Sequence, residues 1–177
     1  MYQVVLLIER ALSRADAREV AGLHEGVDDS THVHVVLPVE NASHRVENAL
    51  GSIAASEILS TSALTFPDVD ISELQREIVE HSKDILARSI DVLRDCHCGA
   101  SGELTTKEPV EAVSEIAQER SAEEVIIVTR PHLVAEFFHV DWTSKARRRL
   151  GVPVLHLLEH QDPAGPDDIP HEVPGQL

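Results

Sequence analysis

The chain has 177 residues, of which 42% are hydrophobic and 26% are charged, values typical of one globular domain. Its formal net charge of -16 argues against binding to nucleic acid or to an anionic membrane surface, because both require clustered positive charge. No apolar run approaches the roughly 20 residues of a membrane span, no signal peptide is recognisable and only two cysteines occur, so we expect a cytoplasmic protein.

Short apolar runs rich in β-branched residues alternate with amphipathic stretches, which predicts strands alternating with helices. In chain order we expect a strand over residues 3–9, a helix over 13–26, a strand over 32–40 and helices over 43–60 and 72–96. We then expect a strand over 100–107, a helix over 109–122, a strand over 123–130, a helix over 142–151 and a strand over 152–158.

Three of these helices begin with specific signals. Ser13 stands at a helix start with Asp16 three residues later, the spacing of a capping box. Asp70 or Ser72 can cap the long helix, and Pro109 suits a first helical turn, where its missing N–H costs nothing.

This element order predicts an α/β fold, a three-layer α/β/α sandwich with a five-stranded parallel sheet covered by helices on both faces. We expect the domain to cover residues 1–158. Residues 159–177 contain four prolines and no lysine or arginine, so we expect them to form a disordered acidic tail. Ligands of such folds bind outside the carboxyl ends of the strands.

The loop after the fourth predicted strand is therefore a candidate ligand-binding segment. It follows the run "EEVIIVTR", covers residues 129–142, contains no glycine and includes Phe137, Phe138 and Trp142. One interpretation is that these aromatic side chains close the pocket as local core, because they bury large apolar areas. The other is that the loop is reshaped around them to hold a different ligand.

The last third of the chain resembles the universal stress protein family. From Glu103 to Leu158 it has a weak strand, a helix, "SAEEVIIVTR", a loop, a short basic helix and "GVPVLHL", which is similar to the closing strand of that family. The run "VVLLIERALS" resembles its opening strand. The resemblance implies a regulatory or binding role in the stress response. It also implies a homodimer paired through the last strand, residues Val154, Leu155, His156, Leu157 and Leu158.

Members of that family that bind ATP carry G-x-x-G, nine further residues and G-[ST] after the fourth strand. Glycine there lets backbone amides approach the phosphates. The corresponding positions here are Thr129, His132, Trp142 and Thr143, of which only Thr143 fits, and Asp141 adds a carboxylate nearby. We therefore expect a binding domain without ATP by this route and without a cofactor.

The alternative is an adenine-nucleotide-binding member with an altered phosphate loop that holds ATP or AMP. The residues then expected to contact the nucleotide lie at strand ends and in the loop, namely Ile8, Glu9, Val39, Thr129, Arg130, His132 and Thr143. Arg130 is the best single candidate for an anion contact. The cluster Arg147–Arg149 either satisfies a helix C-terminus or joins Arg130 in an anion-binding edge.

Two groups of potential metal ligands occur. His32 and His34 are two residues apart on a predicted strand and point the same way, and Cys96-His97-Cys98 ends the long helix. Zinc needs more ligands than either group supplies, so we expect no metal site. The histidines then form a strand pair and the cysteines are structural or surface thiols, with a reactive thiol or an intermolecular disulfide as the alternative.

Catalytic motifs are missing from the sequence, which has no G-x-S-x-G, Walker loop or H-E-x-x-H. We therefore expect no enzyme activity, and a small-molecule hydrolase or transferase of a related nucleotide-binding superfamily is the enzymatic alternative. The chain has 11 histidines, and several that titrate near neutral pH would make the stability of the protein depend on pH.

Overall fold

The structure is a computed structural model that describes residues 1–26, 30–40, 70–129 and 150–160. The helix predicted over 43–60, the loop and basic helix over 130–149 and the tail from 161 lie outside these residues. The described elements are β1 (Tyr2–Ile8), α1 (Arg14–Gly22), β2 (Thr31–Pro38), α3 (Ile71–Asp95), β3 (Gly99–Thr105), α4 (Pro109–Glu119), β4 (Glu124–Thr129) and β5 (Val154–Leu158).

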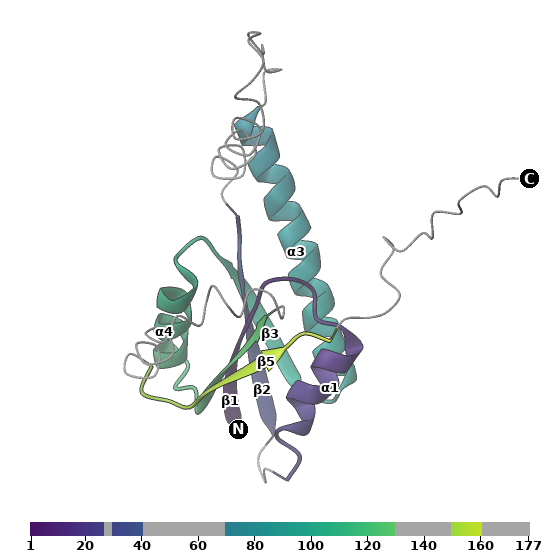
Figure 1. The fold of residues 1–177 in the computed structure, drawn as a ribbon, viewed down its shortest axis with the longest axis vertical. Coiled ribbons are helices and arrows are strands. Elements are labelled where there is room, and N and C mark those ends of the chain that lie inside the picture. The colour runs from purple at the N-terminus through teal and green to yellow at the C-terminus, as the bar shows by residue number, and fades with distance from the viewer. Residues whose placement is uncertain (27–29, 41–69, 130–149, 161–177) are drawn as a thin grey trace, which may run out of the picture.

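These strands form one five-stranded sheet with the order β3-β2-β1-β4-β5, and every neighbouring pair is parallel. Helices α1 and α3 lie on one face of the sheet and α4 lies on the other (Figure 1). The predicted three-layer α/β/α sandwich with a five-stranded parallel sheet is therefore confirmed. The carboxyl ends of all five strands meet at one edge of the sheet.

The core follows from the apolar runs of the central strands. Along β1, Val4, Leu6 and Ile8 pack into the cluster under α1 and α3, whereas Val5 and Leu7 pack into the cluster under α4. All five side chains are buried. A strand covered on both faces has no polar side, which explains the continuous apolar run. Burying each such side chain contributes about 1.5–3 kcal/mol.

The helix starts agree with the sequence. The Ser13 hydroxyl accepts the Asp16 N–H at 3.1 Å, and the Asp16 carboxylate accepts the Ser13 N–H at 3.0 Å, so the capping box is formed. Asp70 caps α3 by accepting N–H groups from the first turn. Pro109 lies in the first turn of α4, and the cap of this helix is Glu108, which was not predicted from the sequence.

Helix α3 has 25 residues, a length of about 37 Å at 1.5 Å per residue. Its C-terminal half covers the sheet, and its N-terminal half extends past the carboxyl ends of the strands (Figure 1). This overhang supplies a wall for any ligand at that edge. Within the described residues, no helix combines the length and the apolar character required to cross a membrane.

The first two residues after β5 contact the domain. The Glu159 N–H donates to the Thr129 carbonyl at 3.0 Å, and the His160 N–H donates to the Asp16 carboxylate at 2.8 Å. Glu159 and His160 are therefore held against the domain by these two bonds. Disorder of the tail remains a prediction, because residues 161–177 lie outside the described part of the chain.

Candidate functional site

Four of the predicted contact residues lie together at the carboxyl edge of the sheet. Ile8 and Thr129 end the adjacent strands β1 and β4 and are buried, whereas Glu9 and Val39 directly follow β1 and β2 and are half-buried. The Val39 N–H donates to the Thr105 carbonyl at 2.8 Å, which keeps the end of β2 beside β3. The other three, Arg130, His132 and Thr143, lie outside the described residues.

A cavity of about 420 Å³ opens at this edge, between the ends of β1 and β2 and the overhanging half of α3. Its volume lies within the range of small-ligand sites. The apolar part of its lining consists of Leu37, Pro38, Leu74, Ile78 and Ile85. The polar part consists of Glu9, Glu40, Glu77, His81 and Ser82.

The strand side of this cavity was predicted from the sequence, and its helix side was not. Leu74, Ile78 and Ile85 repeat at helical spacing, which predicts an apolar helix face without saying what that face contacts. In the structure the same stripe packs on the sheet toward the C-terminus of α3 and lines the cavity toward its N-terminus. The length of the predicted helix could have indicated this wall. The helix is longer than a strand of five to eight residues, so part of it must extend past the sheet.

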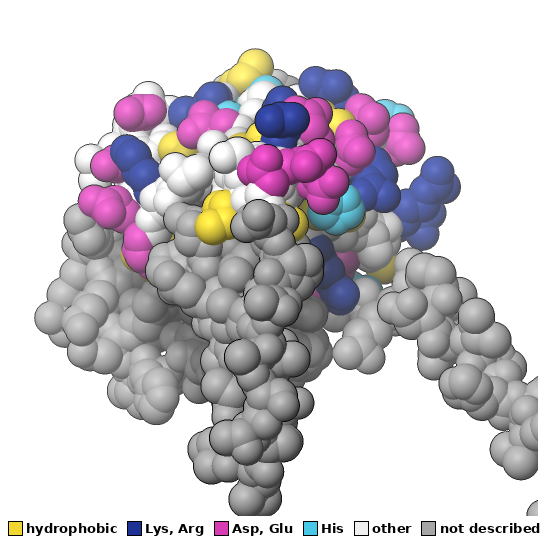
Figure 2. Space-filling view, turned by 90° about the horizontal axis from the view of Figure 1, so that it is seen from above, with side chains coloured by type: hydrophobic (Ala, Val, Ile, Leu, Met, Phe, Trp, Pro, Cys, Tyr) yellow, Lys and Arg dark blue, Asp and Glu magenta, His cyan; other side chains and the backbone are white. Residues whose placement is uncertain are grey.

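Among the described residues, the walls of the cavity carry more negative than positive groups. Glu9, Glu40 and Glu77 contribute carboxylates, and His81 is the one basic side chain that the described part of the chain adds to the lining. Figure 2, which views the molecule from the overhanging end of α3, shows acidic side chains gathered on this face. Carboxylates accept hydrogen bonds from the N–H and O–H groups of a ligand and repel phosphate oxygens.

Two hydrogen bonds determine which polar groups of the site stay in place. The Gln75 amide donates to the Glu40 carbonyl at 3.3 Å, which ties the overhang of α3 to the segment after β2. The Ser82 hydroxyl donates to the Ile78 carbonyl at 2.8 Å, so its hydrogen is used within the helix.

Thr129 is engaged in contacts between strands. Its hydroxyl lies 2.7 Å from His156 Nε2, and its carbonyl accepts the Glu159 N–H. Burial lowers the pKa of His156, which favours the neutral ring that this contact needs at neutral pH. These bonds join the ends of β4 and β5. The Thr129 side chain is therefore a structural contact in this arrangement rather than an open ligand group.

An ion pair at the same end of the sheet connects the residues that follow β1 and β5. The Arg10 guanidinium contacts the Glu159 carboxylate through Nε, at 2.5 Å, and through Nη2. The Glu159 side chain is 5% exposed and the Arg10 side chain is 48% exposed. Neither residue is among the contact residues predicted from the sequence.

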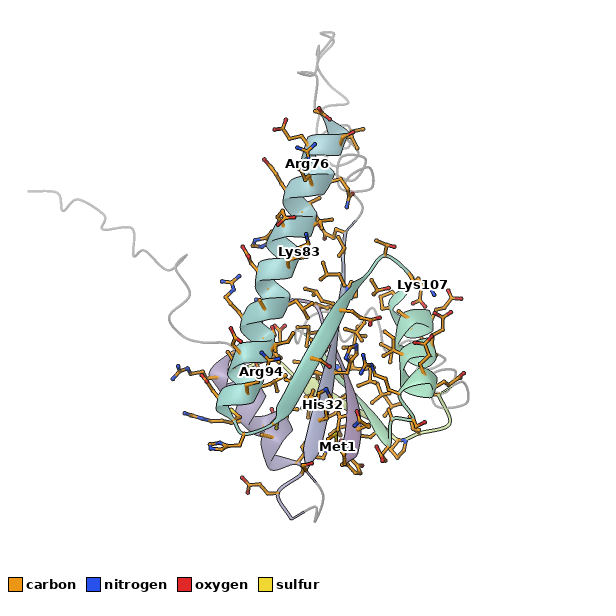
Figure 3. All side chains as sticks on the ribbon, turned by 180° about the vertical axis from the view of Figure 1, so that it is seen from behind. Met1, His32, Arg76, Lys83, Arg94 and Lys107 are labelled. Atoms are coloured by element: carbon orange, nitrogen blue, oxygen red, sulfur yellow. The ribbon has the colours of Figure 1, made fainter. Side chains whose placement is uncertain are left out.

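His32 and His34 lie on one face of β2, as the spacing predicted, and share a partner on β3. Nε2 of His32 and Nδ1 of His34 each lie 2.8 Å from the Ser101 hydroxyl. His34 Nε2 lies 3.3 Å from the Glu103 carboxylate, an ion-pair distance without hydrogen-bond geometry. Figure 3 shows His32 near the amino end of the strands, far from Lys107 at the carboxyl edge.

Burial lowers the pKa of His34, nearby Arg120 lowers it further, and the Glu103 carboxylate partly opposes both effects. Burial also lowers the pKa of His32, with Arg120 and Arg94 adding to the effect. Within the described residues, no group of three or more His, Cys, Asp or Glu side chains is arranged to hold a metal ion. The shared contact with Ser101 makes the two histidines part of the side-chain hydrogen bonding between β2 and β3.

Cys96 and Cys98 are free thiols just after α3, and both are half-buried. Burial raises the pKa of the Cys98 thiol, and the neighbouring Cys96 raises it further. A raised pKa reduces the thiolate fraction at neutral pH and with it the reactivity of the thiol. Both cysteines also pack against the core cluster under α1 and α3, which favours their structural interpretation.

The sequence of this chain matches no protein-family model and no curated protein significantly. Its structure is similar to a universal stress protein from Archaeoglobus fulgidus, with a TM-score of 0.53, 15% identity and coverage of 88% of this chain and 93% of that chain. It is also similar to a universal stress protein family protein from Arabidopsis thaliana with AMP bound. The TM-score is 0.53, the identity is 10%, and the match covers 94% of this chain and 97% of that chain.

A universal stress protein in complex with cAMP is also similar, with a TM-score of 0.52, 12% identity and coverage of 90% of this chain and 98% of that chain. At such identities the likeness concerns the fold. The described residues of the chain have the α/β fold of the universal stress proteins.

Proposed function

We propose that this chain is a non-catalytic binding domain that takes a small ligand at the carboxyl edge of the sheet. The observation that supports this proposal is the cavity of about 420 Å³ between β1, β2 and α3. Apolar side chains form one part of its lining and carboxylates another, which suits a flat or apolar ligand that carries hydrogen-bond donors. A regulatory role in the stress response, expected from the family resemblance, is part of the same proposal.

ATP bound through a glycine-rich loop is not part of this proposal. The sequence has Thr129, His132 and Trp142 where that loop needs glycine. The cavity adds carboxylates from Glu9 and Glu77. Each pair of like charges about 4 Å apart costs about 1 kcal/mol in water and about 4 kcal/mol near a protein surface. A triphosphate brings the largest such cost.

The second candidate ligand is an adenine mononucleotide. The AMP-bound and cAMP-bound universal stress proteins, which share this fold, favour it. A nucleoside also offers amine and hydroxyl hydrogens that the carboxylates of the cavity can accept. A monophosphate carries less negative charge than a triphosphate, so it is repelled less by the acidic lining.

Calorimetric titration with adenosine, AMP, cAMP and magnesium ATP tests these proposals. We expect adenosine or AMP to bind more tightly than ATP, and Leu74→Trp, which fills the cavity, to abolish binding. Ile71→Trp is the matched control, because Ile71 lies on the same helix, is 47% exposed and does not line the cavity. Low micromolar binding of ATP would refute the exclusion of ATP. Equal binding by both tryptophan variants would place the ligand elsewhere.

We also propose that two copies pair through β5, residues Val154 to Leu158. β5 lies at one edge of the described sheet, and its Leu155 and Leu158 side chains are 36% and 49% exposed. An apolar strand at a sheet edge can pair with a second copy of itself. The net charge of -16 continues to argue against nucleic-acid and membrane partners, and the cytoplasm remains the expected compartment.

A further inference from the structure

Arg10 and Glu159 join three strand ends at the edge where the ligand is proposed to bind. Arg10 directly follows Glu9, which lines the cavity at the end of β1. Glu159 directly follows β5, and its N–H is bonded to the Thr129 carbonyl at the end of β4. Ligands of parallel α/β sheets bind outside these carboxyl ends. The ion pair therefore lies at the same carboxyl end of the sheet as the proposed site, with Arg10 one residue after the cavity-lining Glu9.

The two partners differ in how firmly they are held. The Glu159 carboxylate is 5% exposed, and the backbone around it is fixed by the bonds to Thr129 and, through His160, to Asp16. The Arg10 side chain is 48% exposed and has a long, rotatable stem. If a competing anion arrives, the guanidinium can turn toward it while the carboxylate stays in place.

The chemistry of the guanidinium suits such an exchange. It offers five N–H donors in a plane that fits a carboxylate or a phosphate equally well. Here Nε and Nη2 both contact one oxygen of Glu159. The cavity itself presents carboxylates from Glu9, Glu40 and Glu77. A ligand that carries a phosphate therefore needs a cation beside the cavity to offset their repulsion.

We propose that Arg10 is the anion-binding residue of this site and that Glu159 is a built-in carboxylate that competes with the phosphate of a mononucleotide for it. This inference rests on the proposed mononucleotide site. Because the competing carboxylate must be displaced, the apparent affinity for the phosphate is reduced by the fraction of molecules in which Arg10 is paired. The ligand class is a nucleoside monophosphate, and Glu159 regulates its affinity.

Titration of AMP and adenosine into the wild type and four variants tests the proposal. Glu159→Gln keeps a hydrogen-bond acceptor but removes the competing charge, and we expect it to bind AMP about tenfold more tightly. Arg10→Gln should bind AMP about tenfold more weakly, and Arg10→Lys should recover part of the loss. Glu123→Gln is the matched control. It removes the same charge beside Gln3, at the amino end of the strands and away from the proposed site, so it should bind AMP as the wild type does. Adenosine, which has no phosphate, should bind all of them alike.

A second measurement separates this inference from the proposed function. The Arg10 Nε–H resonance is followed by NMR while inorganic phosphate is added to the wild type and to Glu159→Gln. We expect a larger shift of this resonance at lower phosphate concentration in Glu159→Gln. If no protein binds AMP or adenosine but this response is seen, the nucleotide assignment fails and the role of Arg10 stands. If Arg10 responds to neither phosphate nor AMP, or Glu159→Gln behaves as the wild type, the proposal is overturned.

Discussion

His34 is the residue whose environment makes the clearest prediction about pH. Its ring is buried at the centre of a contact with Ser101 and Glu103. Burial lowers the pKa of His34 in the folded protein. In the unfolded chain a histidine has a pKa of about 6.5, so the folded state binds fewer protons than the unfolded state. The stability that this difference supplies is present above about pH 6.5 and is lost as the pH falls below it.

We measure the free energy of unfolding in urea at about pH 7.5 and at about pH 5.5. We expect it to decrease less between these two pH values in His34→Gln than in the wild type. The comparison of differences removes the general effect of a net charge of -16. His97→Gln, at an exposed position, is the control and should follow the wild type. The explanation would be wrong if both variants lost as much stability as the wild type.

At the scale of single residues, patterns within one segment were predictable and partners between segments were not. Ser13 and Asp16 are three residues apart, so their mutual capping is readable from the sequence. The common face of His32 and His34 follows from strand alternation. Their partner Ser101 is 67 residues beyond His34 and becomes a neighbour only through the register of β2 with β3. Register is set by packing of the whole sheet.

Ser89 couples two elements, helix α3 and the segment before α1. Its hydroxyl accepts the Leu12 N–H at 3.1 Å and donates to the Ile85 carbonyl at 2.9 Å, and the residue is fully buried. Ser89→Ala leaves the Leu12 N–H buried without this acceptor, which we expect to cost about 1–3 kcal/mol in the free energy of unfolding. Ser114→Ala is the control, because buried Ser114 donates only to the Val110 carbonyl of its own helix. Equal losses measured in urea would contradict this account.

Gly102 explains why β3 is a weak strand by composition. A Cβ at this position would lie 2.7 Å from the Val35 carbonyl oxygen and 2.8 Å from Leu86 Cδ1, so the strand passes close under α3 only without a side chain there. We expect Gly102→Ala to destabilise the protein by about 1–3 kcal/mol through overpacking. Gly22→Ala, at a helical position with open space around it, should be neutral or stabilising by up to about 1 kcal/mol. Thermal unfolding of both variants decides, and a tolerated Gly102→Ala would refute the close-approach argument.

Helix α3 also shows which element-level features a sequence can reveal. Its predicted bounds, 72–96, agree closely with the observed Ile71–Asp95, because hydrophobic period and the Asp70 cap both act locally. That its first turns would overhang the sheet and form a cavity wall could not be read from the period. The same sequence pattern of Leu and Ile at helical spacing is found in a helix face that packs against a sheet and in one that lines a pocket.

For the whole molecule, the fold class was predictable and the strand order was left open. Alternating strands and helices lead to a parallel sheet with helices on both faces, which the structure confirms. Alternation alone does not place β4 beside β1, an arrangement that puts Glu9 and Arg10 next to Thr129 and Glu159. The Arg10–Glu159 contact spans 149 residues of sequence, so only the assembled sheet discloses it.

Pairing of two copies through β5 is the remaining prediction for the whole molecule. An edge strand that presents apolar side chains, here Leu155 and Leu158, gains burial and backbone hydrogen bonds when it meets a second copy. We expect light scattering at micromolar concentration to give twice the 19.4 kDa mass of one chain.

The double substitution Leu155→Lys and Leu158→Lys should shift the mass to that of one chain, because lysine on an edge strand opposes pairing. Leu23→Lys is the matched control, since Leu23 is a leucine 46% exposed at the end of α1, and it should leave the dimer intact. Circular dichroism establishes that the variants stay folded. A wild-type protein with the mass of one chain, or a double variant that stays paired, would exclude β5 as the interface, because the pairing strand must carry the energy of association.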